Sequence, residues 1–222
     1  MICSNADPGV GGSSATPQAL IITPTRELAI QIYNEARKFA QGSNIKAVVA
    51  YGGTSTGYQA RKLQQGCNIL VATPGRLLDN VEKGRVSFKN LEFLVLDEAD
   101  RMMDMGFMPE IQKCAEDPNM PEKGKRLVLC ILDHFLNYPF HRQTLMFSAT
   151  FPDDIQVAAQ DFLEDYLFLT IGLVGGACSD VEQHFHQVEK HDKREKLEEL
   201  LNDPDRDPKE RTLIFVQVRP YL

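Results

Sequence analysis

The sequence lacks most features that mark membrane, secreted or zinc-binding proteins. No apolar run approaches the ~20 residues of a transmembrane helix, and the N-terminus, MICSNADPGVGGSSATPQ, has no basic segment before an apolar one, so no secretory signal is expected. The histidines, such as His184 and His186, are expected to be structural, because zinc needs four converging ligands. The cysteines form no CxxC pair, which suits a reducing, intracellular compartment; they are Cys3, Cys67, Cys114, Cys130 and Cys178.

Basic residues are in the minority, since 24 lysines and arginines stand against 31 aspartates and glutamates, a net charge of −7. Most nucleic-acid-binding proteins present a basic surface, so composition alone favours an enzyme that acts on a small molecule. A chain of 222 residues, 43% of them hydrophobic, has room for one α/β domain and part of a second.

Short apolar segments alternate with helical patterns, which predicts a parallel α/β sheet with flanking helices. We expect strands at 19–23, 46–51, 68–72, 93–97, 144–148 and 166–171, and helices near 25–41, 56–65, 75–83, 108–116 and 153–163. Segments such as FLVL and TLMF are apolar throughout, as strands buried on both faces are.

The pattern divides the chain into regions. Residues 1–18 are expected to be a flexible lead-in, 19–171 a domain, and 172–180 a linker rich in glycine and small residues. A strand over 181–190, a charged helix near 191–202, a turn-rich loop and a strand at 212–216 would then begin a second domain within 181–222.

Asp97, Glu98 and Asp100 directly follow an apolar strand. Carboxylates at the carboxyl end of a parallel strand face the crevice in which α/β proteins bind ligands. There, one Asp can hold Mg²⁺ through its water shell while an adjacent Glu orients or deprotonates an attacking water. The alternative is an acidic turn that caps the next helix.

Two strand-to-helix junctions and a glycine pair predict a surface for phosphates. Pro24-Thr25-Arg26 opens a helix, with Thr23 or Thr25 as its N-cap, and Thr73-Pro74-Gly75-Arg76 repeats the arrangement. Helix N-termini offer free N–H groups, and Gly52-Gly53 permits close approach of a ligand. Each feature alone is usually structural, but together they would let an acidic protein follow an RNA backbone with dipoles and a few arginines.

Ser148-Ala149-Thr150 ends the strand expected at 144–148. If that strand neighbours 93–97, the hydroxyl groups of Ser148 and Thr150 could bond Asp100 and link a nucleotide site to an RNA surface. Thr150 also suits the N-cap of the following helix. The two interpretations are compatible.

In order and approximate spacing, PTRELA, GG, TPGR, DEAD and SAT resemble the motifs of the DEAD-box ATP-dependent RNA helicases over residues 19 to about 171. The resemblance implies a RecA-like domain without its N-terminal phosphate-loop part, followed by the start of a second RecA-like domain. AYGGT, DMGFMPEI and GGACSDVEQ resemble the Vasa subfamily, whose members act in germ cells.

The resemblance implies ATP hydrolysis, with Mg²⁺, coupled to local unwinding of RNA. Asp97, through water, and Glu98 would serve the metal and the attacking water, while Asp100, Ser148 and Thr150 would couple hydrolysis to unwinding. Single-stranded or duplex RNA would be contacted through its backbone, without sequence preference, by Pro24, Thr25, Arg26, Gly52, Gly53, Thr73, Pro74, Gly75 and Arg76. It also implies germ-granule protein partners and a cytoplasmic, perinuclear or nuclear location, away from membranes.

The sequence departs from the family at three places. No G-x-x-x-x-G-K-[ST] phosphate loop occurs, and the family carries this loop upstream of PTRELA, which is ahead of Met1 here. Residues 127–142 are apolar and aromatic where the family has a short polar connection. Near the end of the chain, TLIFVQ begins as the family's next motif does, but the residues after it, 218–222, no longer match that motif. We therefore expect a truncated chain that is inactive alone; the alternative is a non-catalytic fragment that binds RNA or a partner.

Residues 127–142 and 218–222 are also candidates for translated introns. Codons for Arg126-Leu127 and for Gln217-Val218-Arg219 can contain GT donor sites, and codons for 138–142 can form a pyrimidine run that ends in an AG acceptor. Excising 127–142 keeps the frame and gives MPEKGKRQTLMFSAT, which is closer to the family. The alternative is a genuine insertion that forms a small surface helix.

Overall fold

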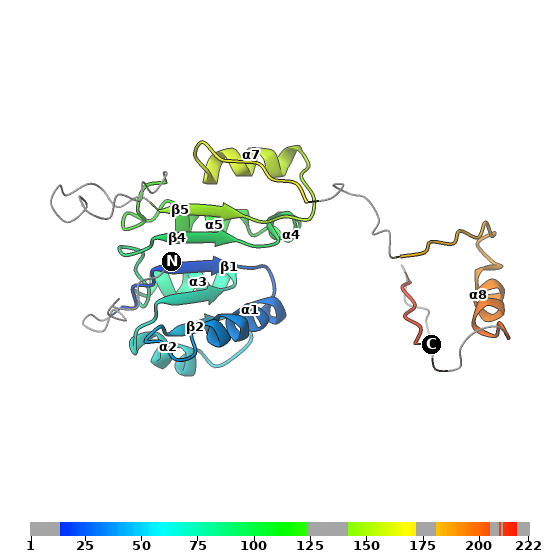
Figure 1. Ribbon diagram of the computed structural model, residues 1–222, viewed down its shortest axis with the longest axis horizontal. Helices are drawn as coiled ribbons and strands as arrows, with labels where there is room; N and C mark the ends of the chain where they lie inside the picture. The colour runs from blue at the N-terminus through cyan, green and yellow to red at the C-terminus, as the bar shows by residue number, and fades with distance from the viewer. Residues whose placement is uncertain (1–13, 124–141, 172–180, 205–208, 210, 217–222) are drawn as a thin grey trace. The chain divides into compact units, whose positions relative to one another are not determined.

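The computed structural model describes residues 14–123, 142–171, 181–204, 209 and 211–216. The chain divides into two units, Met1–Gly176 and Ala177–Leu222 (Figure 1). None of the described helices is both long and apolar enough to cross a lipid bilayer.

The first unit is built on a five-stranded parallel sheet with the strand order β2-β3-β1-β4-β5 (Figure 1). Its strands are β1 (Ala19–Ile22), β2 (Ala47–Ala50), β3 (Ile69–Ala72), β4 (Phe93–Leu96) and β5 (Gln143–Met146). In the register of the sheet, Leu20 lies opposite both Leu70 and Leu94. The predicted parallel sheet is confirmed, and the inner strands β1, β3 and β4 are apolar throughout because side chains cover both of their faces.

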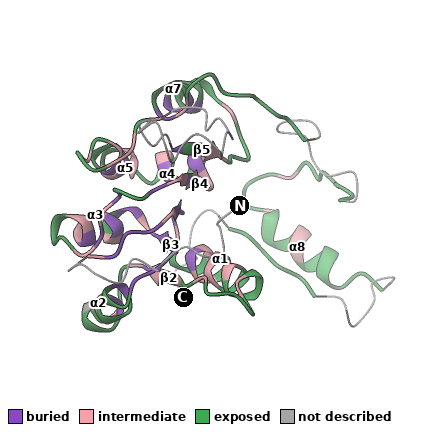
Figure 2. Ribbon diagram, turned by 60° about the vertical axis from the view of Figure 1, so that its left-hand side comes forward, coloured by how far each residue is buried: buried purple, intermediate pink, exposed green. Residues whose placement is uncertain are grey.

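Helices flank both faces of this sheet. They are α1 (Arg26–Phe39), α2 (Thr56–Gln64), α3 (Pro74–Glu82), α4 (Ala99–Asp104), α5 (Met108–Ala115) and α7 (Asp153–Phe162). The chain goes from β1 to β2 in one direction across the sheet and returns through β3 to β4 in the other. Because crossovers between parallel strands are right-handed, the helices of these two sets of connections must lie on opposite faces of the sheet. Figure 2 shows α1 on one face and α2, α3 and α5 on the other.

The main core lies on the face covered by α3 and α5. Alternate strand residues such as Leu20 and Leu94 point into it and meet Leu77 of α3 and Ile111 of α5, all of them at most 1% exposed. On the opposite face, α1 packs on β2 and β3 and buries Ala29. The two faces of the sheet are therefore covered to different extents by the described helices.

The ordered domain begins before the predicted boundary at residue 19. Ala15 is buried, its N–H donates to the Arg85 carbonyl at 2.8 Å, and its carbonyl accepts from the Ser87 N–H at 2.9 Å. Ser14–Gln18 therefore pack with the segment after α3 instead of forming part of a flexible lead-in. Residues 1–13 lie outside the described part of the chain.

Three predicted strands are wrong. Residues 166–171 in the first unit, and 181–190 and 212–216 in the second, have no strand, and nearly all of them are exposed. A strand needs a neighbouring strand for its hydrogen bonds, and none of these segments is part of the described sheet. In the first unit, Phe168 instead stacks on Phe151, with 4.4 Å between ring centroids.

In the second unit, the charged helix predicted near 191–202 is confirmed as α8 (Lys193–Leu201). Ion pairs one turn apart, such as Arg194 with Glu198 at 2.9 Å, support it on the surface. The linker 172–180, residues 127–141 of the possible insertion and the tail 218–222 lie outside the described residues. Arg142, the last residue of that possible insertion, is described and is buried.

Candidate functional site

Because all five strands are parallel, the loops that follow them meet at one edge of the sheet, the carboxyl-terminal edge. The strand order places Gly52-Gly53 after β2, Thr73–Arg76 after β3, and Pro24–Arg26 after β1. Asp97 follows β4 and Ser148 follows β5. The three segments predicted to contact RNA therefore follow adjacent strands, and the acidic and hydroxyl segments share the other end of the edge.

Asp100 is bonded directly to the segment after β5. Its Oδ2 atom accepts hydrogen bonds from Thr150 Oγ1 at 2.7 Å and from the Thr150 N–H at 3.0 Å. The Asp100 N–H donates to Ser148 Oγ at 3.3 Å. The predicted contact of both hydroxyl groups with Asp100 is confirmed. Thr150 is not the N-cap of α7, because Pro152 occupies that position.

These bonds favour the ionised form of Asp100. Burial is the largest single influence and raises the pKa of this carboxyl group. The hydrogen bonds from Thr150, Arg101 and Ser148 together outweigh burial, so the pKa lies below its ordinary value. Asp100 is therefore held as a fixed carboxylate between β4 and β5.

Asp97 has the opposite electrostatic setting. Burial raises its pKa; the hydrogen bond from the Glu98 N–H, at 3.1 Å, opposes this effect, and the charge of Glu98 adds to it. The hydrogen bond from the Glu98 N–H thus offsets the effect of burial on Asp97 only in part.

Glu98 adopts a left-handed backbone conformation, with φ 53° and ψ 53°. This conformation is strained for a residue other than glycine and tends to occur where function requires it. Glu98 stands at the N-cap position of α4, but its side chain makes no capping hydrogen bond. Its carboxylate pairs with Arg101 at 3.2 Å. The side chain therefore does not act as the helix cap that was the alternative to a functional role.

The residues at the end of β4 suit Mg²⁺ bound together with phosphates. Within the described ranges, no group of three or more His, Cys, Asp or Glu side chains converges as a metal site. Mg²⁺ is usually held by one or two carboxylates, with water and substrate phosphates as the remaining ligands. Asp97 offers one such carboxylate, with Glu98 next to it, and burial raises the pKa of Asp97. A cation bound there would favour the ionised form of Asp97.

At the start of α1, the structure decides between the two candidate N-caps. The Leu28 N–H donates to Thr25 Oγ1 at 3.3 Å, so Thr25 is the cap, whereas Thr23 is fully buried. Arg26, the first residue of the helix, is exposed, and its guanidinium lies 4.9 Å from the centre of the Tyr51 ring. This contact links the segment after β1 to the segment after β2.

The loop Tyr51–Thr54, after β2, is tied to both α2 and α3. Gln59 of α2 donates to the Tyr51 carbonyl at 3.0 Å and to Thr54 Oγ1 at 2.7 Å, and it accepts from the Tyr51 N–H at 3.3 Å. Arg76 of α3 donates to the Thr54 carbonyl at 3.3 Å. Gly53, with φ +78°, occupies the left-handed region that favours glycine.

Arg76 is turned into the protein. Only 12% of its side chain is exposed, and it also lies 3.7 Å from Asp79. Thr73, by contrast, is at the N-cap of α3 with Pro74 in the first turn, as predicted, although its side chain makes no capping bond. The structure therefore gives Arg26 an exposed position and Arg76 a bracing one.

Sequence patterns did not indicate roles for Tyr51, Gln59 or Arg101. Tyr51 adjoins the glycine pair, and this position was the available signal. Gln59 carries none, because a buried glutamine on a short helix looks like any surface glutamine until the fold is known. Arg101 follows the acidic motif by one position, and its pairing with Glu98 depends on the helical turn.

Two cysteines fall within the described ranges, Cys67 and Cys114, and both are buried free thiols. Burial raises the pKa of each to about 12, so neither is a ready nucleophile. Cys3, Cys130 and Cys178 lie outside the described residues.

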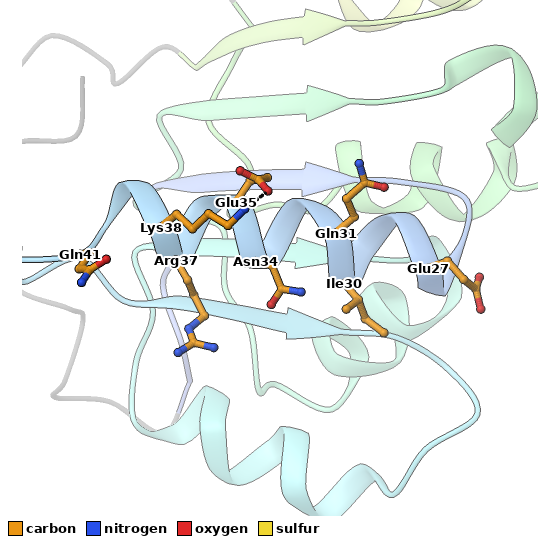
Figure 3. A pocket seen from close by; sticks show the side chains of 8 residues that line it. All are labelled: Glu27, Ile30, Gln31, Asn34, Glu35, Arg37, Lys38 and Gln41. Atoms are coloured by element: carbon orange, nitrogen blue, oxygen red, sulfur yellow. Dashed lines mark hydrogen bonds and ion pairs between the residues drawn. The ribbon is translucent and has the colours of Figure 1, made fainter.

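A further hollow follows the outer side of α1, where Figure 3 shows its lining side chains. They are Glu27, Ile30, Gln31, Asn34, Glu35, Arg37, Lys38 and Gln41. The two acidic and two basic groups balance, and Glu35 pairs with Lys38 at 2.6 Å. These features provide no chemistry that we assign to this hollow.

Comparison with known proteins agrees with the motifs and the fold. Residues 3–158 match the DEAD/DEAH box helicase family. The ATP-dependent RNA helicase DDX4 of Mus musculus is 50% identical over 204 residues, which are 91% of this chain and 26% of the mouse protein. The DDX4 proteins of Sus scrofa and Homo sapiens match to the same extent.

The fold is also similar to a crystal structure of the yeast DEAD-box splicing factor Prp28, with a TM-score of 0.55 and 36% identity over 68% of this chain and 31% of that chain. The chain spans about a quarter of the length of the curated relatives it matches. Its motifs, its parallel sheet and these similarities together show that the chain belongs to the DEAD/DEAH box helicase family.

Proposed function

We propose that this chain forms part of an RNA-stimulated ATPase that unwinds RNA duplexes locally. The observation that carries the proposal is the bonding of Asp100 to Ser148 and Thr150, which joins the acidic segment after β4 to the segment after β5. Such a connection lets a change at the nucleotide shift a neighbouring loop. The identity to ATP-dependent RNA helicases supports the assignment.

The two ends of the carboxyl-terminal edge have different roles, nucleotide hydrolysis at one end and RNA binding at the other. Mg²⁺, when bound with ATP, would offset charge on the phosphates; Asp97 would hold it through water. Glu98 orients the attacking water or takes its proton. Asp100 passes the state of this site to Ser148 and Thr150. At the other end, Arg26 and the helix N-termini after β1 and β3 bind the RNA backbone.

The catalytic part is tested in a chimaera in which this chain replaces its matching 204 residues of mouse DDX4, so that the remainder of the relative supplies the rest of the reaction. Glu98→Gln should retain ATP binding and lower RNA-stimulated turnover by about 10²–10⁴-fold, the usual contribution of a positioned acid–base group. Glu164→Gln, at an exposed glutamate, is the matched control. Normal turnover in Glu98→Gln would exclude this role for Glu98.

The RNA part is tested by titrating the 222-residue chain with several unrelated single-stranded RNAs. Arg26→Ala should lower the affinity for each of these RNAs by a similar factor, because phosphate contacts carry no base information. Arg37→Ala, an exposed arginine in the last turn of the same helix, is the control. A loss confined to one RNA would contradict backbone recognition.

We also propose a Vasa-like place of action, in cytoplasmic granules around the nuclei of germ cells and with granule proteins as partners. The resemblance of AYGGT and DMGFMPEI to that subfamily and the 50% identity to DDX4 support it. Antibody staining of gonad and somatic tissue tests the proposal, and uniform or purely nuclear staining in both tissues would contradict it.

A further inference from the structure

Side chains of two helices, Gln59 of α2 and Arg76 of α3, hydrogen-bond to the loop Tyr51–Thr54. Gln59 is 7% exposed, and its side chain bonds three different groups of the loop, namely both backbone groups of Tyr51 and the hydroxyl of Thr54. Asn and Gln side chains can satisfy several partners at once in this way, with one acceptor oxygen and two N–H donors. Gln59 of α2 thereby holds the Tyr51 backbone on one side of Gly52-Gly53 and the Thr54 side chain on the other, while Arg76 of α3 bonds the Thr54 carbonyl.

The same loop also holds the exposed arginine of the neighbouring segment. Arg26 lies over the ring of Tyr51 at 4.9 Å, which is within the range of a cation–π interaction. A Cβ atom added at Gly53 would come within 3.9 Å of Arg26 Nη1. The arginine therefore rests against the loop that Gln59 fixes, so its position depends on the loop.

We propose that Tyr51 and Gln59 are positioning residues for RNA. Gln59 fixes the loop Tyr51–Thr54, and Tyr51 holds the Arg26 guanidinium above its ring, so that the loop and the arginine present one surface to the RNA backbone. This inference rests on the proposed RNA binding at the carboxyl-terminal edge. It assigns to both side chains an effect on affinity that acts through Arg26 and the loop backbone, without contact between Gln59 and RNA.

A stability role alone makes a different prediction. If Gln59 only satisfied buried groups of its own loop, its loss would lower the melting temperature and leave the RNA affinity of the folded chain unchanged. If Tyr51 only filled space, any apolar side chain of similar size would serve. The two roles are separated by measuring RNA affinity, its salt dependence and folding on the same variants.

The test is a double-mutant cycle in the 222-residue chain, with a fluorescein-labelled oligouridine as the RNA. Tyr51→Leu should weaken binding about two- to fivefold, the factor expected for one exposed cation–π contact. Tyr51→Phe, which keeps the ring, should bind like the wild type. In an Arg26→Ala background, Tyr51→Leu should have little further effect, because its effect depends on that arginine.

Gln59→Met removes the amide while keeping the length of the side chain. It should weaken RNA binding and speed hydrogen exchange of the amides of Tyr51–Thr54, measured where circular dichroism shows the variant to be folded. Gln64→Met, at an exposed position of the same helix, should change neither quantity. Should Gln59→Met not fold, Gln59→Asn, which keeps the amide but shortens the side chain, takes its place. Unchanged RNA affinity in the folded variant would contradict the role of Gln59, and the Tyr51 cycle decides the role of Tyr51.

The outcomes separate this proposal from the one on which it rests. If the wild-type chain does not bind RNA, or Arg26→Ala binds normally, RNA binding at this edge is wrong. If Arg26→Ala weakens binding while Tyr51→Leu does not, or if the two effects add fully, positioning by Tyr51 is wrong and RNA binding stands. A loss in Tyr51→Phe equal to that in Tyr51→Leu would likewise contradict the cation–π role.

Discussion

Asp97 and Asp100 are three residues apart, yet their surroundings shift their pKa values in opposite directions. Burial raises the pKa of Asp97, whereas hydrogen bonds, chiefly from Thr150, overcome burial and lower that of Asp100. The fold thus favours the ionised form of Asp100 and disfavours that of Asp97. Such an unfavourable setting for a charge is common where the group is retained for binding or catalysis.

This contrast predicts opposite effects of two similar substitutions. A carboxyl group with a raised pKa in the folded chain destabilises folding above its ordinary pKa of about 3.9. Asp97→Asn should therefore raise the melting temperature at pH 7, and the gain should vanish as both states become protonated below that pKa. Thermal melts followed by circular dichroism across this range test it; a melting temperature at pH 7 below that of the wild type would contradict it.

For Asp100, the expected effect of the substitution on the melting temperature is the opposite. A lowered pKa gives stability that is present above the ordinary value of about 3.9 and is lost as pH falls through the folded value. Asp100→Asn should therefore lower the melting temperature at pH 7, and the difference from the wild type should shrink in acid. The same melts measure it, and a difference that grows as pH falls would argue against the bonds to Thr150 as its source.

Gly53 and Gly52 form a further residue-scale comparison. Gly53 has φ +78°, whereas Gly52 lies outside the positive-φ region and has open space where a Cβ would stand. Gly53→Ala should lower the free energy of unfolding by about 1 kcal/mol, the cost of a left-handed conformation for an L-residue, and Gly52→Ala should change it little. Urea denaturation of both variants measures the difference, and equal effects would contradict the assignment of strain to Gly53.

At the scale of elements, the sequence predicted the strands and helices that a local pattern of apolar residues determines. The strands β1, β3 and β4 were found because residues buried on both faces are apolar throughout. The six-residue helix α4 was missed because it is too short to show a helical period. Residues 166–171 and 212–216 look like strands but have no described strand as a neighbour, and no local pattern reveals whether a neighbour exists.

The strand order lay beyond local pattern as well. It is set by long-range pairing, and it decides that Asp100 meets Ser148 and Thr150 and that Tyr51 meets Arg26. The residues of the candidate site could be predicted from motifs that each occupy one segment. Gln59 and the bracing position of Arg76 could not, since both depend on contacts between elements.

The boundary of β5 gives a prediction about residues 127–142. Arg142 is 5% exposed, donates from Nε to Thr144 Oγ1 at 3.3 Å, and bonds the Pro121 carbonyl. Deleting 127–142 would place Arg126 directly before Gln143, where it can form the same contacts. The shortened chain should keep or raise its melting temperature.

Two substitutions serve as the control for that deletion. Arg126→Ala should destabilise the shortened chain as Arg142→Ala destabilises the original one, because the same buried contacts are lost in each. A shortened chain that fails to fold would contradict the equivalence of the two arginines. Sequencing spliced RNA across both junctions separately tests whether 127–142 and 218–222 are translated introns.

At the scale of the whole molecule, the proposed RNA binding would depend on a few local contacts, because the chain as a whole is acidic. The net charge is −7, and Arg26 is the exposed arginine among the residues predicted to contact RNA. Log affinity for single-stranded RNA should therefore fall with log salt with a shallow slope, of about −0.7 for each neutralised phosphate. A steep slope, typical of many phosphate contacts, would place RNA on another surface.

An isolated β-bridge pairs Lys123 with Arg142 at the amino-terminal end of β5. This end is opposite to the end that leads to Ser148. Four residues of strand separate the two ends, which is about 13 Å. A segment inserted between Lys123 and Arg142 would therefore begin and end at the amino-terminal edge of the sheet, opposite the edge that carries the carboxylates. This makes the junction a permissive position for a fluorescent reporter or an affinity tag, and a place where the lengths of homologous chains can diverge without cost to the chemistry.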